Sequence, residues 1–211
     1  MKSQRTVGIF SRDGRQSYNW LIDMLNETDF SKDVKEVLPI YIGNNFSEFT
    51  ANVSGCGFAI LYHTKNRGRV NVTNVTDSLY DEELKYLSKK LGKQCVIVVI
   101  DDLEDSSDKF KESLLANQPR IREFSQELFL ISQVEKKTLN EEMMNKKLQM
   151  KNIMASNKKG NNKEGDRGTR GGEGTGDGQE KKPGEKEEDT RNTEESVPKA
   201  PNKCSGCCCF Q

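Results

Sequence analysis

The chain has 211 residues, of which 33% are hydrophobic, below the roughly 45–50% of globular domains on a scale that also counts glycine. Lysine plus arginine and aspartate plus glutamate number 33 each, so the formal net charge is zero. The charge balance gives no electrostatic support for nucleic acid as a partner, and the low apolar content predicts that part of the chain forms no core.

The first 63 residues alternate between strand and helix patterns. TVGIF (6–10), VKEVLPIYI (34–42) and CGFAILYH (56–63) are short apolar runs, as in buried strands. Between the first and second runs, YNWLIDML (18–25) places four apolar residues on one helical face. Between the second and third runs, FSEFTANV (46–53) predicts a short helix or turn. The four residues are Trp20, Leu21, Met24 and Leu25.

SLYDEELKYLSKKLG (78–92) has the clearest helical pattern in the chain. Ser78 with Asp81 predicts a capping box at its start, and Gly92 predicts its end. Apolar residues recur at steps of four, three and four, so they predict a buried stripe. These are Tyr80, Leu84, Leu87 and Leu91.

Two further strands and two helical stretches follow. CVIVVI (95–100) is apolar on both faces, which is typical of a parallel strand covered on both sides, and LFLIS (128–132) predicts the last strand. A helical stretch between them is broken by Pro119, and residues 133–154 predict one charged helix with its apolar side chains on one side. Those side chains are Val134, Leu139, Met143, Leu148 and Met150.

This alternation predicts an α/β fold with a three-layer, doubly wound, mostly parallel five-stranded sheet in a flavodoxin-like (2-1-3-4-5) or Ras-like order. We expect an α/β domain over residues 1–132, a charged C-terminal helix over 133–154, a disordered Gly- and charge-rich linker over 155–203 and a Cys-rich lipidation signal over 204–211. A linker of about 50 residues has a root-mean-square span of about 40 Å.

Basic side chains cluster in two loops of the predicted sheet. In this fold ligands bind beyond the carboxyl ends of the strands at the switch point, which brings loops 11–17 and 64–73 together. The amino end of the first helix adds partial positive charge, so the loops are a candidate anion-binding site. The alternative is that they are solvated loop residues. The basic residues are Arg12, Arg15, Lys65, Arg67 and Arg69.

The order of elements resembles that of a small GTPase, but the nucleotide motifs of that family are missing. A phosphate-binding loop needs G-x-x-x-x-G-K-S/T, whereas five residues separate Gly8 from Gly14, and Arg15 and Gln16 stand where Lys and Ser/Thr are required. IDDLED (100–105) lies where the guanine-specifying N-K-x-D is expected and contains neither Asn nor Lys. We therefore carry over no residue for GTP binding or hydrolysis.

The stretch GIFSRDGRQSYNWLIDML (8–25) resembles Toll/interleukin-receptor domains, some of which cleave NAD with a helical glutamate. Glu82 or Glu83 lies in the corresponding region, but both fit the solvated face of an amphipathic helix. His63, the single histidine, fits a structural role at a strand end. Four acids near residue 100 suggest either a Mg²⁺ site or a helix cap, and we favour the cap: Asp101, Asp102, Glu104 and Asp105. No catalytic residue, metal ligand or cofactor is assigned.

The sequence KCSGCCCFQ (203–211) carries four of the six cysteines. Its last four residues fit C-a-a-X with a terminal Gln, which is associated with farnesylation, and resemble the tails of Ras and Rho small GTPases except at Cys209, where an aliphatic residue is usual. The resemblance implies prenylation of Cys208, and Cys204 and Cys207 are expected to carry palmitoyl groups. Palmitoylation alone, zinc binding through C-x-x-C and redox use are the alternatives.

Together these features predict a lipid-anchored binding or signalling adaptor with a non-catalytic α/β domain. We expect it on the cytoplasmic face of the plasma membrane or an endomembrane, with a cytosolic pool, an unidentified protein partner and an anionic ligand as a candidate. Cys56 and Cys95 lie in or beside apolar runs and are expected to be reduced. The competing function is a divergent nucleotide-using enzyme, GTPase-like or NAD-cleaving, that uses loops 11–17 and 64–73.

Overall fold

The structure is a computed structural model that describes residues 4–138 and 140–156. Its centre is a five-stranded sheet in the order β2-β1-β3-β4-β5, and every neighbouring pair is parallel. The predicted α/β class is confirmed, and of the two predicted strand orders, flavodoxin-like and Ras-like, the flavodoxin-like order is the observed one. The strands are β1 (Arg5–Ser11), β2 (Val34–Tyr41), β3 (Phe58–Thr64), β4 (Val96–Leu103) and β5 (Glu127–Ser132).

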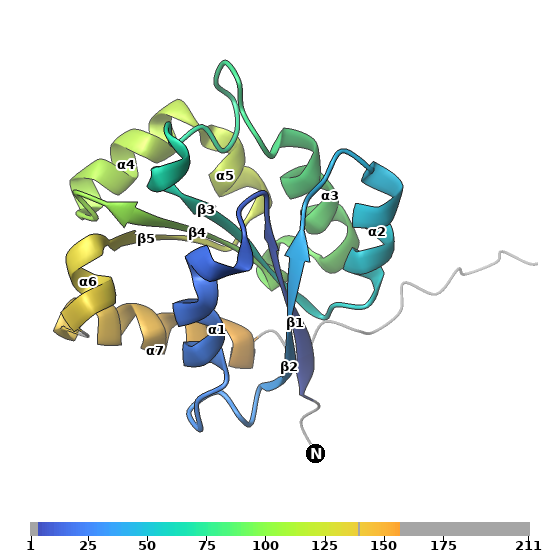
Figure 1. Cartoon of the computed structure of the whole chain (residues 1–211), viewed down its shortest axis with the longest axis horizontal. Helices are drawn as coiled ribbons and strands as arrows, with labels where there is room; N and C mark the ends of the chain where they lie inside the picture. Colours follow the sequence, from blue (N-terminus) through green and yellow to red (C-terminus); the bar gives the residue numbers. More distant parts are fainter. Residues whose placement is uncertain (1–3, 139, 157–211) are drawn as a thin grey trace, which may run out of the picture. The chain divides into compact units, whose positions relative to one another are not determined.

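Helices cover both faces of the sheet, as Figure 1 shows. One face packs against α2 (Phe46–Ser54), α3 (Asp81–Leu91), α4 (Asp108–Asn117) and α5 (Pro119–Phe124). The other face packs against α1 (Asn19–Leu25) and α7 (Glu141–Ser156). Shorter helical segments are η1 (Arg15–Tyr18), η2 (Lys65–Arg67), η3 (Lys93–Cys95) and α6 (Gln133–Thr138). None of the helices in the described part of the chain is long and apolar enough to cross a bilayer.

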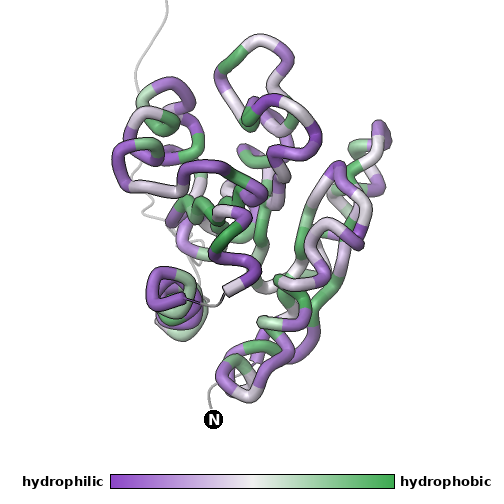
Figure 2. Tube along the Cα trace, turned by 60° about the vertical axis from the view of Figure 1, so that its left-hand side comes forward, coloured by the Kyte–Doolittle hydropathy of each residue, from purple (hydrophilic) through white to green (hydrophobic). Residues whose placement is uncertain are grey.

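Strand β4 illustrates why the core has two halves. Its side chains alternate, so Val98 and Ile100 join the cluster under α3 and α4, whereas Ile97 and Val99 join the cluster under α1 and α7. All four are fully buried. In Figure 2, hydrophobic residues are seen mainly along the inner segments of the trace and hydrophilic residues over its outer turns. The apolar run was therefore correctly interpreted as a strand covered on both sides.

Helix α3 matches the predicted stripe but not the predicted cap. Tyr80, Leu84 and Leu87 are fully buried, and Gly92 ends the helix at φ 86° with its N–H bonded to the Ser88 carbonyl at 2.9 Å. The capping box was wrong, because Tyr80 is the N-cap and has no capping side-chain bond. Instead, the Ser78 hydroxyl donates to the Asp81 carboxylate.

The segment predicted as one charged helix forms two. α6 ends at Thr138, and Asn140 starts α7 by accepting the Met143 N–H at 3.0 Å. A capping box that we missed begins α6: Ser132 accepts the Glu135 N–H at 3.2 Å, and Glu135 accepts the Ser132 N–H at 2.6 Å. The S-x-x-E spacing of these two residues was the available signal.

The predicted apolar side of this segment was only half right. Met143 and Met150 are buried, together with Met154, whereas Val134 and Leu148 are 63% and 54% exposed. Leu139 lies outside the described residues. The break between α6 and α7 changes the helical phase, so a periodicity drawn across it cannot hold.

Candidate functional site

The loops after β1 and β3 meet, as the strand order requires. Arg12 follows β1, and its guanidinium donates to the Leu79 carbonyl at 3.0 Å and pairs with the Glu83 carboxylate at 2.6 Å. The guanidinium also lies 5.9 Å from the centre of the Tyr80 ring. The positive charge of Arg12 is therefore used to hold α3 against the β1 loop.

Arg67, from η2, crosses to the same place. It donates to the Arg12 carbonyl at 2.7 Å and to the Asp13 carboxylate at 3.2 Å. Asp13 is 8% exposed and also accepts a bond from the Ser11 hydroxyl. Arg12 and Arg67 are thus close together, but each already has a carboxylate partner, and the sequence alone did not identify the partners Asp13 and Glu83.

The other three basic residues of the candidate anion site do not converge in the same way. Arg15 and Lys65 are exposed on η1 and η2, and Arg69 is exposed beyond η2. Only Arg67 and Arg69 line a shared cavity of about 310 Å³, which Asp77 also lines. The anion site therefore stays a prediction for these residues.

His63 lies near the end of β3 and is fully buried. Its Nε2 lies 3.0 Å from the Arg69 carbonyl, which can only accept, so this nitrogen carries the proton. The Nδ1 atom has no hydrogen-bond partner. Burial lowers the pKa of His63, so the ring is neutral and holds the loop after β3 in place.

A second polar cluster lies at the carboxyl end of β4. The Lys136 ammonium is 3.0 Å from an Asp101 oxygen and 2.7 Å from an Asp102 oxygen. The same Asp101 oxygen accepts the Trp20 indole N–H at 2.8 Å, whereas its other oxygen has no partner. Asp102 adopts a φ of 57° and accepts bonds from Thr64 and Asn66.

The environments of these two acids push their pKa values in opposite directions. Asp101 is fully buried, and desolvation raises its pKa despite the nearby Lys136. Burial also raises the pKa of Asp102, but the bonds from Lys136 and Thr64 outweigh it and hold the value below its usual range. Lys136 therefore takes the place between the carboxylates that a cation would need.

The predicted helix cap is only partly right, because the N-cap of α4 is Ser107 and not one of the four acids. Asp105 accepts the Ser107 N–H at 2.8 Å, and Ser107 caps α4 by accepting the Phe110 N–H at 3.3 Å. Within residues 4–138 and 140–156, no group of three or more His, Cys, Asp or Glu side chains is arranged to hold a metal ion.

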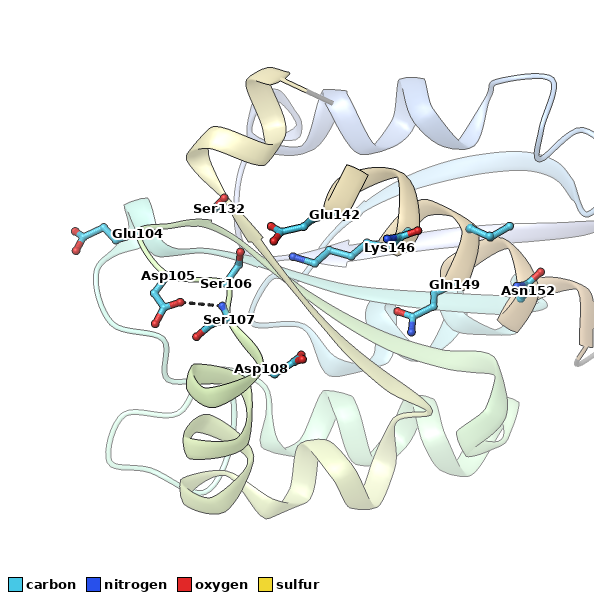
Figure 3. Close-up of a pocket in the computed structure, with 12 residues that line it drawn as sticks. Glu104, Asp105, Ser106, Ser107, Asp108, Ser132, Glu142, Lys146, Gln149 and Asn152 are labelled. Carbon is cyan, nitrogen blue, oxygen red and sulfur yellow. Dashed lines mark hydrogen bonds between the residues drawn. The ribbon is translucent and has the colours of Figure 1, made fainter. Parts of the chain in front are cut away.

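A cavity of about 710 Å³ lies between the β4–α4 loop and α7 (Figure 3). Glu142 and Lys146 project from α7, opposite Ser106 and Asp108. The Lys146 ammonium is held by the Glu135 carboxylate and the Leu130 carbonyl. The cavity therefore offers hydroxyl, carboxylate and amide groups beside a similar area of apolar surface, and its one lysine is already engaged.

A second cavity of about 660 Å³ lies between α1 and α7, and we call it the α1–α7 groove. Its surface is mainly apolar, in contrast to the cavity beside α4. The apolar lining residues are Trp20, Met24, Met143, Met144 and Leu148. The charged and amide lining residues are Asp23, Glu27, Asp29, Lys136, Asn145, Lys147 and Lys151.

The cysteines expected to carry lipid, Cys204, Cys207 and Cys208, lie outside the described residues. Cys56 and Cys95 are free thiols, as expected. Burial raises the pKa of Cys56 to about 11, so this thiol stays protonated and unreactive at neutral pH.

Comparison with known proteins identifies no family for this chain. No family model matches the sequence, and no curated protein matches it. Among solved structures, the pilus assembly protein CpaE from Caulobacter crescentus CB15 matches with a TM-score of 0.36 and 10% identity, over 72% of this chain and 98% of that chain. A similarity of this size shows neither a family nor a function.

Proposed function

We propose that this protein is a lipid-anchored binding or signalling adaptor whose α/β domain is held at the cytoplasmic face of a membrane. The observation that carries the proposal is the sequence Cys208-Cys209-Phe210-Gln211, which fits C-a-a-X. Cys208 takes a farnesyl group, and Cys204 and Cys207 take palmitoyl groups.

The second lipid signal follows from the energetics of anchoring. A single lipid chain binds a membrane only marginally and reversibly, although each CH₂ group that it buries contributes about 0.8 kcal/mol of binding free energy. The nearest basic residues before the cysteines are Lys199 and Lys203, each of which contributes about 1 kcal/mol near an anionic leaflet. Two lysines do not replace a second hydrocarbon chain, so palmitoylation supplies it.

The loop geometry favours an adaptor over a nucleotide-using enzyme. An anion bound between loops 11–17 and 64–73 must compete with Glu83 for Arg12 and with Asp13 for Arg67. A thermal-shift screen with GTP, ATP and NAD separates the two functions, because a ligand at 100 times its dissociation constant stabilises the fold by about 2.7 kcal/mol. We expect no shift, and a shift with any of the three supports the enzyme instead.

The anchor is tested by the intact mass of the protein from eukaryotic cells, with and without a farnesyltransferase inhibitor. We expect a farnesyl adduct that the inhibitor and Cys208→Ser both remove, with loss of membrane association. The matched control is the double variant Cys204→Ser/Cys207→Ser, which keeps the farnesyl adduct but leaves the membrane more readily. If Cys208→Ser sediments with membranes as the wild type does, the proposal is wrong.

A further inference from the structure

The α1–α7 groove has the surface of a hydrocarbon site. Methionine side chains from both helices form much of its apolar lining, and methionine adapts its shape to irregular apolar ligands. Met144 and Leu148 remain 64% and 54% exposed at the groove. Its volume of about 660 Å³ lies within the range of ligand pockets, roughly 300–1,000 Å³.

Two of the three lysines that line the groove, Lys136 and Lys147, are paired with carboxylates. Lys147 contacts Glu27 and lies 3.0 Å from Asp29, and Lys136 is held by Asp101 and Asp102. These contacts pair both ammonium groups with carboxylates without a ligand. The groove therefore complements an uncharged molecule better than an acid or a base.

The Lys147 contacts also limit the shape of the ligand. They connect α7 to the segment that follows α1, so the two sides of the groove are bridged here by the contacts of Lys147 with Glu27 and Asp29. An α-helix is about 10 Å wide with its side chains and does not fit there without breaking the contacts. A single hydrocarbon chain is much thinner and passes beside them.

We propose that the α1–α7 groove binds the farnesyl group of Cys208 from the same chain when the protein is away from the membrane. This inference rests on the proposed lipidation. Cys208 follows Ser156, the last described residue, by 52 positions (208 minus 156), and the linker predicted from composition spans about 40 Å. Tethering on this scale gives an effective concentration in the millimolar range, so the protein's own lipid outcompetes dilute lipid from other sources.

Occupancy of the groove explains how a farnesylated chain maintains a cytosolic pool. The groove covers hydrocarbon that water would otherwise contact, and the bilayer competes for the same chain. Binding to the groove and binding to the membrane are then mutually exclusive for one farnesyl group. Weakening the groove should shift the protein toward membranes.

Trp20 provides a direct readout, since it is the single tryptophan and it lines the groove. We would titrate the full-length, unmodified protein with S-farnesyl-cysteine methyl ester and follow Trp20 emission. A saturable change is expected. Met144→Asp/Leu148→Asp should weaken binding at least about tenfold, because two carboxylates then face the hydrocarbon.

Val134→Asp is the matched control, because Val134 is 63% exposed on α6 and does not line the groove. It should bind the probe as the wild type does. All three substituted side chains are exposed, so the variants should remain folded, which circular dichroism checks. No Trp20 response, or equal weakening by the control, would overturn the proposal.

A second arm uses the protein farnesylated on Cys208. Its Trp20 emission should match the probe-saturated state at every protein concentration and should not respond to added probe. The Met144→Asp/Leu148→Asp variant should lose that emission and bind phosphatidylserine-containing vesicles more strongly. An emission change that grows with protein concentration, together with dimers in sedimentation, assigns the groove to a second copy and overturns the intramolecular site.

The two proposals fail in different experiments. Cells that leave Cys208 unmodified refute the anchor, although the unmodified protein still reports whether the groove binds the farnesyl probe. A farnesyl adduct in cells with no Trp20 response to the probe refutes the groove and leaves the anchor intact.

Discussion

Replacing Lys136 with methionine tests the buried charge cluster at the end of β4. The substitution keeps most of the side-chain volume but removes the ammonium that contacts Asp101 and Asp102. Asp101 is fully buried, and one of its oxygens already lacks a partner, so its negative charge is left with the Trp20 N–H and the nearby Tyr62 side chain. We therefore expect the variant to fold with a large loss of stability.

The magnitude follows from the burial of each group. Removing one partner of a buried ion pair costs about 3–5 kcal/mol. Lys136 is 20% exposed, and Asp102 keeps its bonds from Thr64 and Asn66, so the cost falls mainly on Asp101. The expected loss is thus about 3 kcal/mol, or roughly 6–12 °C in Tm for a domain of this size.

The assay is urea unfolding followed by circular dichroism, with Asp101→Asn as the second arm of a double-mutant cycle. Lys136→Met/Asp101→Asn should recover most of the loss, because no uncompensated charge remains. A loss below about 1 kcal/mol, or no recovery in the double variant, refutes the reasoning.

The pH dependence has a definite sign. Burial raises the folded-state pKa of Asp101 above its unfolded value, and removing Lys136 raises the pKa further. The folded state then binds more protons than the unfolded state, so the unfolding free energy of Lys136→Met rises, relative to wild type, as the pH falls through the folded pKa. A penalty that grows on acidification contradicts this.

Three further outcomes are expected. Burial lowers the folded-state pKa of His63, so below about pH 6.5 only the unfolded state takes up the proton. The unfolding free energy should therefore fall there by up to about 1.4 kcal/mol per pH unit. His63→Phe should show a shallower slope in the same urea titrations. Gly92→Ala should cost about 1–3 kcal/mol by thermal unfolding, because φ 86° with ψ 141° is a backbone conformation that residues other than glycine rarely adopt. Met150→Ala should lower the unfolding free energy by about 2–5 kcal/mol, because this side chain is fully buried. Leu148→Ala should lower it by less than about 0.5 kcal/mol, because Leu148 is 54% exposed. Equal losses would contradict the burial pattern of α7.

The sheet could be predicted from the sequence because its signals are local and strong. Each strand is a short apolar run, and the run at residues 95–100 is apolar on both faces, which is typical of a covered parallel strand. Right-handed crossovers then restrict the strand orders to a few. Cap residues were harder, because Ser78 and Ser132 both precede an acid by three positions, and only Ser132 caps a helix.

The partners of the charged side chains depend on the tertiary structure. The sequence by itself determined the alternating elements and their parallel sheet, whereas the tertiary structure decided between the flavodoxin-like and the Ras-like strand order. The sequence did not determine that Arg12 pairs with Glu83, that Arg67 pairs with Asp13, or that Lys136 occupies the place of a cation. The periodicity of one helix depends on neighbours within a few residues. These ion pairs and the groove join side chains that lie 34 (136 minus 102) to 120 positions apart, and their distance is set only when the helices pack on the sheet.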